Sequence, residues 1–229
     1  MNAKRPSGGL VAGARTATRV TVSTFGVIVG LAGIEHGIGE ILQGNAAPEG
    51  VTIQSWPDAW VFDLLDSEPA MTVVPNFLAT GVLAVLVSLV FLVWNAGFVH
   101  QKHGALVTIL LSLVMLLLGT GFGPPILGVV LGAAATRIGA PLTRWRSQRL
   151  LAKLWPWTLV GGVTAFLMVL PGTVLLDYFF GVSEIWFAVP VLSFAILSAF
   201  GLLLLAIFAG FARDARCRAG LHKAPSTGG

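Results

Sequence analysis

The distribution of charge constrains this chain more than any other feature. All fourteen lysines and arginines of the 229 residues fall at positions 4–19, 102, 137–153 and 213–223, and long apolar segments separate these positions. Multi-pass membrane proteins keep basic residues in cytoplasmic loops, because moving them across the bilayer is costly. Both termini and every basic loop are therefore predicted to be cytoplasmic. Most of the acids lie in the segments that this arrangement places outside: Glu49, Asp58, Asp63, Asp66, Glu68, Asp177 and Glu184.

Composition supports the same class of protein. Hydrophobic residues make up 55% of the chain and charged residues 10%, with a mean hydropathy of +0.86. An average soluble domain has about 25% charged residues. The basic stretches flank apolar segments, and they form no surface on which basic and aromatic residues alternate. We therefore expect them to contact anionic lipid head groups and not nucleic acid. The single cysteine, Cys217, excludes a disulfide framework and a paired-cysteine metal or redox motif.

The apolar segments predict an all-α integral membrane protein of about six transmembrane helices in the plasma membrane. The third and fourth segments are short, since a span needs about 20 residues to cross a hydrocarbon core of about 30 Å. They form either two crossings, which we favour, or one re-entrant hairpin. Basic tails at 1–19 and 213–229 flank the domain at 20–212. The predicted spans are 20–42, 75–99, 105–122, 126–138, 157–176 and 185–211.

The first outer loop, residues 44–72, carries a helix-start signal. Ser55 is followed three positions later by Asp58, with a proline between them, which is typical of a capped first turn. Trp56, Trp60 and Leu64 then recur at four-residue steps. We predict a short amphipathic helix here, which either lies on the outer leaflet or packs as a lid on the helix ends.

The first span divides into three faces on a helical wheel. Gly26, Gly30, Gly33 and Gly37 form a stripe that predicts close approach of a neighbouring helix. An apolar face, which includes Leu31, is expected to meet lipid. The third face is polar and is expected to point into the bundle.

The polar face carries the candidate site. Charged groups are rare within spans and usually mark a functional site or a buried pair. His36 and Glu40 are four residues apart and are predicted to pair, with Gln43 beside them and Glu35 on the flank. Further groups are expected near that depth: Asn76, Thr80, Asp66, Glu68, Asp177 and Tyr178.

A histidine beside carboxylates can bind a divalent cation, relay protons or act as a general acid and base. It can also simply join helices by pairing. If a metal binds, His36 and Glu40 are the expected ligands. The sequence implies no cofactor, and the absence of a phosphate-binding loop, serine elbow or zinc-protease motif argues against an enzyme.

Three functions fit these residues. The leading hypothesis is transport or permeation of a proton, metal cation or small solute through an outward-facing His/Glu site. The second is an interaction subunit or assembly factor with a membrane-protein partner or a second copy of the chain. The third is an intramembrane enzyme that acts on a lipid-linked substrate with His36 as base.

Two blocks carry a resemblance. Residues 35–44 (EHGIGEILQG) and 68–77 (EPAMTVVPNF) are similar to segments of small bacterial multi-pass membrane proteins of unassigned activity. The resemblance covers the first four predicted spans and implies neither a substrate nor a cofactor.

Overall fold

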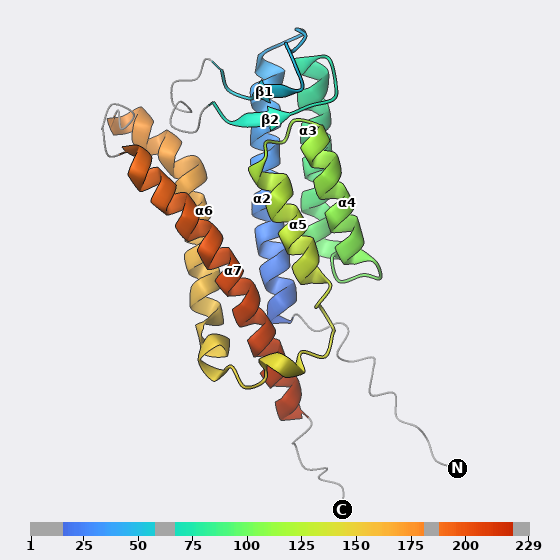
Figure 1. Ribbon diagram of the computed structural model, residues 1–229, viewed down its shortest axis with the longest axis vertical. Helices are drawn as coiled ribbons and strands as arrows, with labels where there is room; N and C mark the ends of the chain where they lie inside the picture. The colour runs from blue at the N-terminus through green and yellow to red at the C-terminus, as the bar shows by residue number, and fades with distance from the viewer. Residues whose placement is uncertain (1–15, 58–66, 181–187, 222–229) are drawn as a thin grey trace, which may run out of the picture.

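The computed structural model describes residues 16–57, 67–180 and 188–221, and it is mainly helical (Figure 1). Helix α3 continues into one turn of π-helix, η2 (Trp94–Phe98), and a 3-10 turn, η3 (Thr143–Trp145), precedes α6. The main helices are α2 (Ala17–Leu42), α3 (Phe77–Val93), α4 (Gly104–Leu117), α5 (Gly123–Ala135), α6 (Arg149–Phe180) and α7 (Ala188–Leu221).

Within the described residues, four stretches of helix are long and apolar enough to cross a membrane: Ala17–Leu42, Phe77–Phe98, Arg149–Val169 and Ser193–Gly220. Helices α4 and α5 are apolar but have 14 and 13 residues. At 1.5 Å per residue each is about 20 Å long, short of a core of about 30 Å. Helices therefore occupy the predicted segments, and the third and fourth are the short ones.

The helix ends differ from the predicted ones for local reasons. Helix α5 begins at Gly123 and not at residue 126, because its two prolines occupy the first turn, where their missing N–H groups cost nothing. Helix α6 begins eight residues before the predicted start, and α7 continues ten residues beyond the predicted end at 211. Basic residues that were assigned to a loop and a tail are therefore helical.

Helix α2 lies at the centre and contacts α3, α5, α6 and α7. The glycine stripe is confirmed, because Gly26, Gly30, Gly33 and Gly37 all lie against α3 or its π-turn. Leu31 on the opposite face is exposed, as the wheel predicts. Helices α6 and α7 form a hairpin that leans away from the other helices toward the end where α2 finishes (Figure 1).

The mainly helical structure confirms the all-α prediction, and a small antiparallel sheet that was not predicted lies at that end. Strand β1 (Thr52–Gln54) pairs with β2 (Pro69–Met71). The turn between α4 and α5 is tied to this sheet, since Gly119 donates to the Met71 carbonyl at 2.8 Å. We call this end of the molecule the sheet end. Residues 58–66, with Trp60, Leu64 and Asp66, lie outside the described residues, so most of the predicted amphipathic helix is not described.

The opposite end, which we call the basic end, holds every Lys and Arg that the structure describes. These side chains come from the start of α2, the 99–103 turn, the 136–148 segment, the start of α6 and the last turns of α7 (Figure 1). One acid lies among them. Asp214 of α7 is buried and accepts the N–H groups of Ala17 at 2.7 Å and Thr18 at 3.0 Å. It therefore caps the first turn of α2.

Candidate functional site

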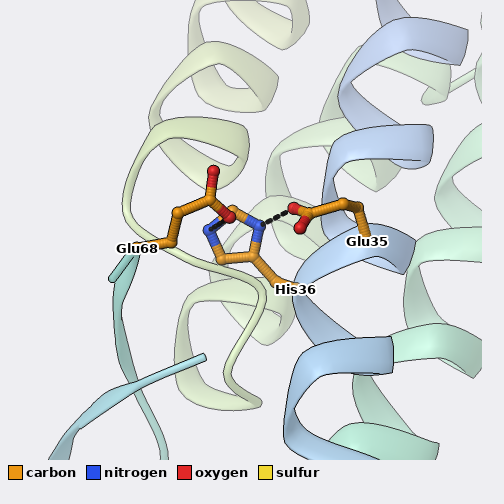
Figure 2. Close-up of side chains that lie close together, drawn as sticks. All are labelled: Glu35, His36 and Glu68. Carbon is orange, nitrogen blue, oxygen red and sulfur yellow. Dashed lines mark ion pairs between the residues drawn. The ribbon is translucent and has the colours of Figure 1, made fainter. Parts of the chain in front are cut away.

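His36 lies near the end of α2 between two carboxyl groups. Its Nδ1 is 3.0 Å from Oε2 of Glu35, and its Nε2 is 3.5 Å from Oε2 of Glu68. Figure 2 shows the imidazole ring between these carboxyl groups, one from α2 and one from the segment that leads into β2. His36 and Glu68 are each 7% exposed. We call these three residues the His36 cluster.

The hydrogen bonds of the ring assign one of its protons. Nδ1 lies 3.1 Å from the carbonyl oxygen of Ala32, and a carbonyl can only accept, so Nδ1 is the donor. Nε2 faces Oε2 of Glu68 at 3.5 Å, a distance at which an imidazolium and a carboxylate attract one another. Burial raises the pKa of Glu68 to about 8; the charge of His36 opposes this shift, and that of Glu35 adds to it.

The cluster has more acidic groups than basic groups. Glu35 and Glu68 supply two carboxyl groups, and one imidazole lies between them. The described Lys and Arg residues all lie at the other end of the molecule, so none of them pairs with the cluster.

Glu40 does not pair with His36, which corrects the prediction from their four-residue spacing. Its side chain is fully buried against Gly119 and the methyl group of Thr80. Among the described residues neither carboxylate oxygen has a hydrogen bond, although the Ser55 hydroxyl lies near enough to act on the group. The α4–α5 turn draws Glu40 away from the histidine, and Glu35 and Glu68 take its place.

Two turn glycines seat these side chains. Gly119 and Gly121 have φ angles of +84° and +76°, which favour glycine. A Cβ at Gly119 would collide with the Glu40 carboxylate, and one at Gly121 with the His36 ring. In the sequence these glycines indicated no more than a turn, so the contact was missed.

The other predicted residues mainly hold the fold together. Gln43 donates to the carbonyls of Gln54 and Ser55, both at 3.0 Å, and so fixes β1 to α2. Asn76 caps α3, where it accepts from Ala79 at 2.9 Å.

Four further predicted residues lie apart from the His36 cluster or cannot be placed in it. The Thr80 hydroxyl lies 3.0 Å from that of Thr72, beside Glu40. Tyr178 is 69% exposed and packs on Phe179. Asp66 and the side chain of Asp177 lie outside the described residues.

An apolar cavity of about 230 Å³ adjoins the His36 cluster. It lies between α2, α5, α6 and α7, and Pro69 of β2 also borders it. His36 and Glu68 are its two ionisable lining residues. Three phenylalanines line it from separate segments: Phe122, Phe166 and Phe200. The site thus joins a charged group to a hydrophobic chamber.

The cluster could also hold a metal ion, since its ligand atoms lie within 4.8 Å of one another. Nδ1 of His36 is already bonded to Ala32 and Glu35. Nε2 and Glu68 would therefore be the ligands, and Glu35 would orient the ring, as second-sphere carboxylates do. This set has fewer protein ligands than the three typical of catalytic zinc, and it contains Glu68 in place of the predicted Glu40.

The chain matches no protein-family model, no curated protein and no solved structure. The resemblance to small bacterial membrane proteins therefore stays a prediction, and function has to be argued from the site alone.

Proposed function

We propose that this protein is a multi-pass membrane protein that carries a cation across the membrane by way of the His36 cluster. The basic end is assigned to the cytoplasm and the sheet end to the outside, because translocation of basic residues is disfavoured. The four long apolar helices and the gathering of described Lys and Arg at one end support this arrangement.

The observation that carries the proposal is the excess of carboxyl groups over basic groups in the cluster. A buried charge that lacks a partner is strongly destabilising. Two carboxyl groups around one histidine therefore favour a cationic ligand: a proton, a metal ion or a small cationic solute. The same charge disfavours an anionic solute.

Buried polar side chains beyond the cluster support an onward route for a proton. Thr80, Ser88 and Asn95 are fully buried on the face of α3 and its π-turn that meets α2. Thr108 and Ser112 of α4 are buried in the same way, and the Thr108 hydroxyl lies 3.2 Å from Oδ1 of Asn95. These groups extend from Glu40 toward the basic end. Fully apolar side chains would offer a moving proton no hydrogen bonds.

A second candidate function is an enzyme on a lipid-linked substrate, and the apolar cavity beside His36 favours it. An isoprenoid or acyl chain would suit the cavity walls, and the imidazole could act as a base. The phosphate of such a substrate would, however, meet the carboxylates of Glu35 and Glu68. This candidate predicts that Glu68→Gln strengthens binding of an anionic lipid, whereas cation transport predicts that the same change removes flux.

Flux into liposomes tests the proposal. The purified protein is reconstituted, and influx of protons, Mn²⁺ and benzyltrimethylammonium is measured separately. Transport of at least one of the three is expected, and Glu68→Gln and His36→Ala should abolish it. Glu49→Gln removes an exposed acid from the same loop and should leave it unchanged. Flux that is absent for all three probes, or that survives both substitutions in the cluster, would overturn the proposal and return the interaction subunit as the next hypothesis.

A further inference from the structure

The cavity beside the His36 cluster differs from an ordinary ion site in what surrounds the charge. Its walls are apolar apart from His36 and Glu68. The rings of Phe166 and Phe200 lie with their centroids 5.9 Å apart, and both line it. Aromatic faces attract cations, and most strongly where water is excluded.

Metal ions fit this environment poorly. Hard divalent cations take six or more oxygen ligands, many of them from water. The cluster offers one ring nitrogen and the nearest carboxylate oxygens, and the remaining directions around an ion would face Leu127, Val29 and the phenylalanines. An organic ammonium needs only one or two charged contacts, and its carbon groups gain from apolar walls.

Size and charge limit the ligand further. The volume of about 230 Å³ is below the roughly 300–1,000 Å³ of pockets for drug-sized molecules. The cluster has one carboxyl group more than it has basic groups, which suits a monocation. We propose that the cavity binds a small hydrophobic organic cation, with its ammonium group beside Glu68 and His36 and its apolar body among the phenylalanine rings. This inference rests on the proposed function, since it names the class of cation that the site carries.

Two glycines allow a matched test of the cavity. Gly123 lines it, and a Cβ added there would meet nothing within 4 Å. Gly123→Leu should therefore fold and fill the chamber. Gly201 of α7 also has open space around its Cβ and does not line the cavity, so Gly201→Leu is the control. Thermal unfolding of both variants verifies that they are folded.

Binding is measured by calorimetry on the full chain in nanodiscs, with three probes of similar shape. Benzyltrimethylammonium is the cation, neopentylbenzene its neutral isostere and benzylphosphonate an anion. We expect the cation to bind at least about tenfold more tightly than the neutral probe, because Coulomb attraction to the carboxyl groups and cation–π contact with the phenylalanine rings add to burial. The anion should not bind. Gly123→Leu and Glu68→Gln should each weaken cation binding about tenfold or more, while Gly201→Leu and Glu49→Gln should not.

Equal binding of the cation and the neutral isostere would overturn the inference, as would unchanged binding in Gly123→Leu. Its failure is distinguishable from that of the proposed function. One possible result is flux of protons or Mn²⁺ that depends on Glu68 and is unaffected by benzyltrimethylammonium. This result would contradict binding of an organic cation but would leave the transport proposal standing. Binding with the expected selectivity but without flux of any probe would keep the site and remove transport.

Discussion

Both ends of this molecule bury carboxyl groups, but they surround them differently. At the basic end both oxygens of Asp214 accept backbone N–H groups from the first turn of α2. At the sheet end Glu68 lies 3.5 Å from a histidine nitrogen and near a second carboxyl group, that of Glu35, and Glu40 has no hydrogen bond among the described residues. Both oxygens of Asp214 are therefore satisfied by the fold. The carboxyl groups at the sheet end are not, which leaves them free to contact a ligand.

The comparison predicts opposite responses when the acids are removed. Asp214→Ala should destabilise the protein by about 3 kcal/mol, because two charge-assisted hydrogen bonds and the capping of α2 are lost together. Glu68→Gln should leave stability unchanged or raise it, since its carboxyl group is buried at a cost. Chemical unfolding in detergent measures both. A loss on Glu68→Gln as large as that on Asp214→Ala would mean that the sheet-end acids are structural as well.

Substitution of Gly121, which lies against the His36 ring, gives the next largest expected effect. Gly121→Ala should cost about 2 kcal/mol, because a left-handed backbone is disfavoured for alanine and the new Cβ would displace the imidazole. Gly139 has a similar φ of +81° with nothing within 4 Å of its Cβ. Gly139→Ala therefore measures the backbone strain alone, expected at about 1 kcal/mol.

Thermal unfolding of the two glycine variants, together with cation flux, checks this prediction. Gly121→Ala should also impair flux, because the ring moves away from Glu68. Equal costs at the two positions would show that Gly121 is required only for the turn.

The two ends also differ in how far they could be predicted from sequence. Hydropathy and charge predicted the apolar helices, and the glycine spacing predicted close approach of a neighbouring helix, because both depend on local pattern; that this helix is α3 became clear only from the structure. The partners of His36 depend on tertiary contacts. The helical wheel placed Glu35 on the flank and Glu40 beside His36. In the structure the Glu40 carboxylate packs against Gly119 of the α4–α5 turn, and Glu68, which precedes β2, lies beside His36.

Two further features left no readable pattern. Strands of three residues are too short for a period-two signal. Asp214 lies among arginines near the chain end, which predicted a tail and hid its role as a cap. The sequence therefore named His36 and Glu35 and gave Glu68 as a possible contributor, but it favoured Glu40 as the partner of His36, whereas the ion pairs of His36 are with Glu35 and Glu68.

The pH dependence of stability should test the contrast between the buried acids at the two ends of the molecule. The pKa of Glu68 rises from its usual 4.5 to about 8 on folding, so the folded protein holds this proton more tightly than the unfolded chain. The stability contributed by that proton is complete below pH 4.5 and is lost as the pH rises through 8. We expect the free energy of unfolding to decline by about 1 kcal/mol between pH 5 and 9. The decline is small because the neighbouring His36 favours the ionised form of Glu68 and so offsets part of the effect of burial.

Other groups titrate over the same range, so the difference between wild type and Glu68→Gln is the quantity to measure. Melting temperatures of the two proteins across the range provide it. The substitution should flatten the curve. Parallel curves for the two proteins would show that Glu68 does not hold an extra proton in the fold.

The smallest expected effect is the coupling between His36 and each acid. Glu68 lies 3.5 Å from Nε2, whereas Glu40 forms no ion pair among the described residues. A double-mutant cycle of His36→Ala with Glu68→Gln should give a coupling energy of about 1 kcal/mol. The cycle with Glu40→Gln should give a value near zero, although Glu40 is the residue one helical turn away.

Both cycles can be measured by unfolding at pH 7 in the same detergent, with the Glu49→Gln cycle as the baseline. A larger coupling to Glu40 than to Glu68 would restore the pair that the sequence favours. It would also remove the Glu68 carboxyl group from the cluster, and with it the excess of acidic over basic groups on which the proposed cation binding depends.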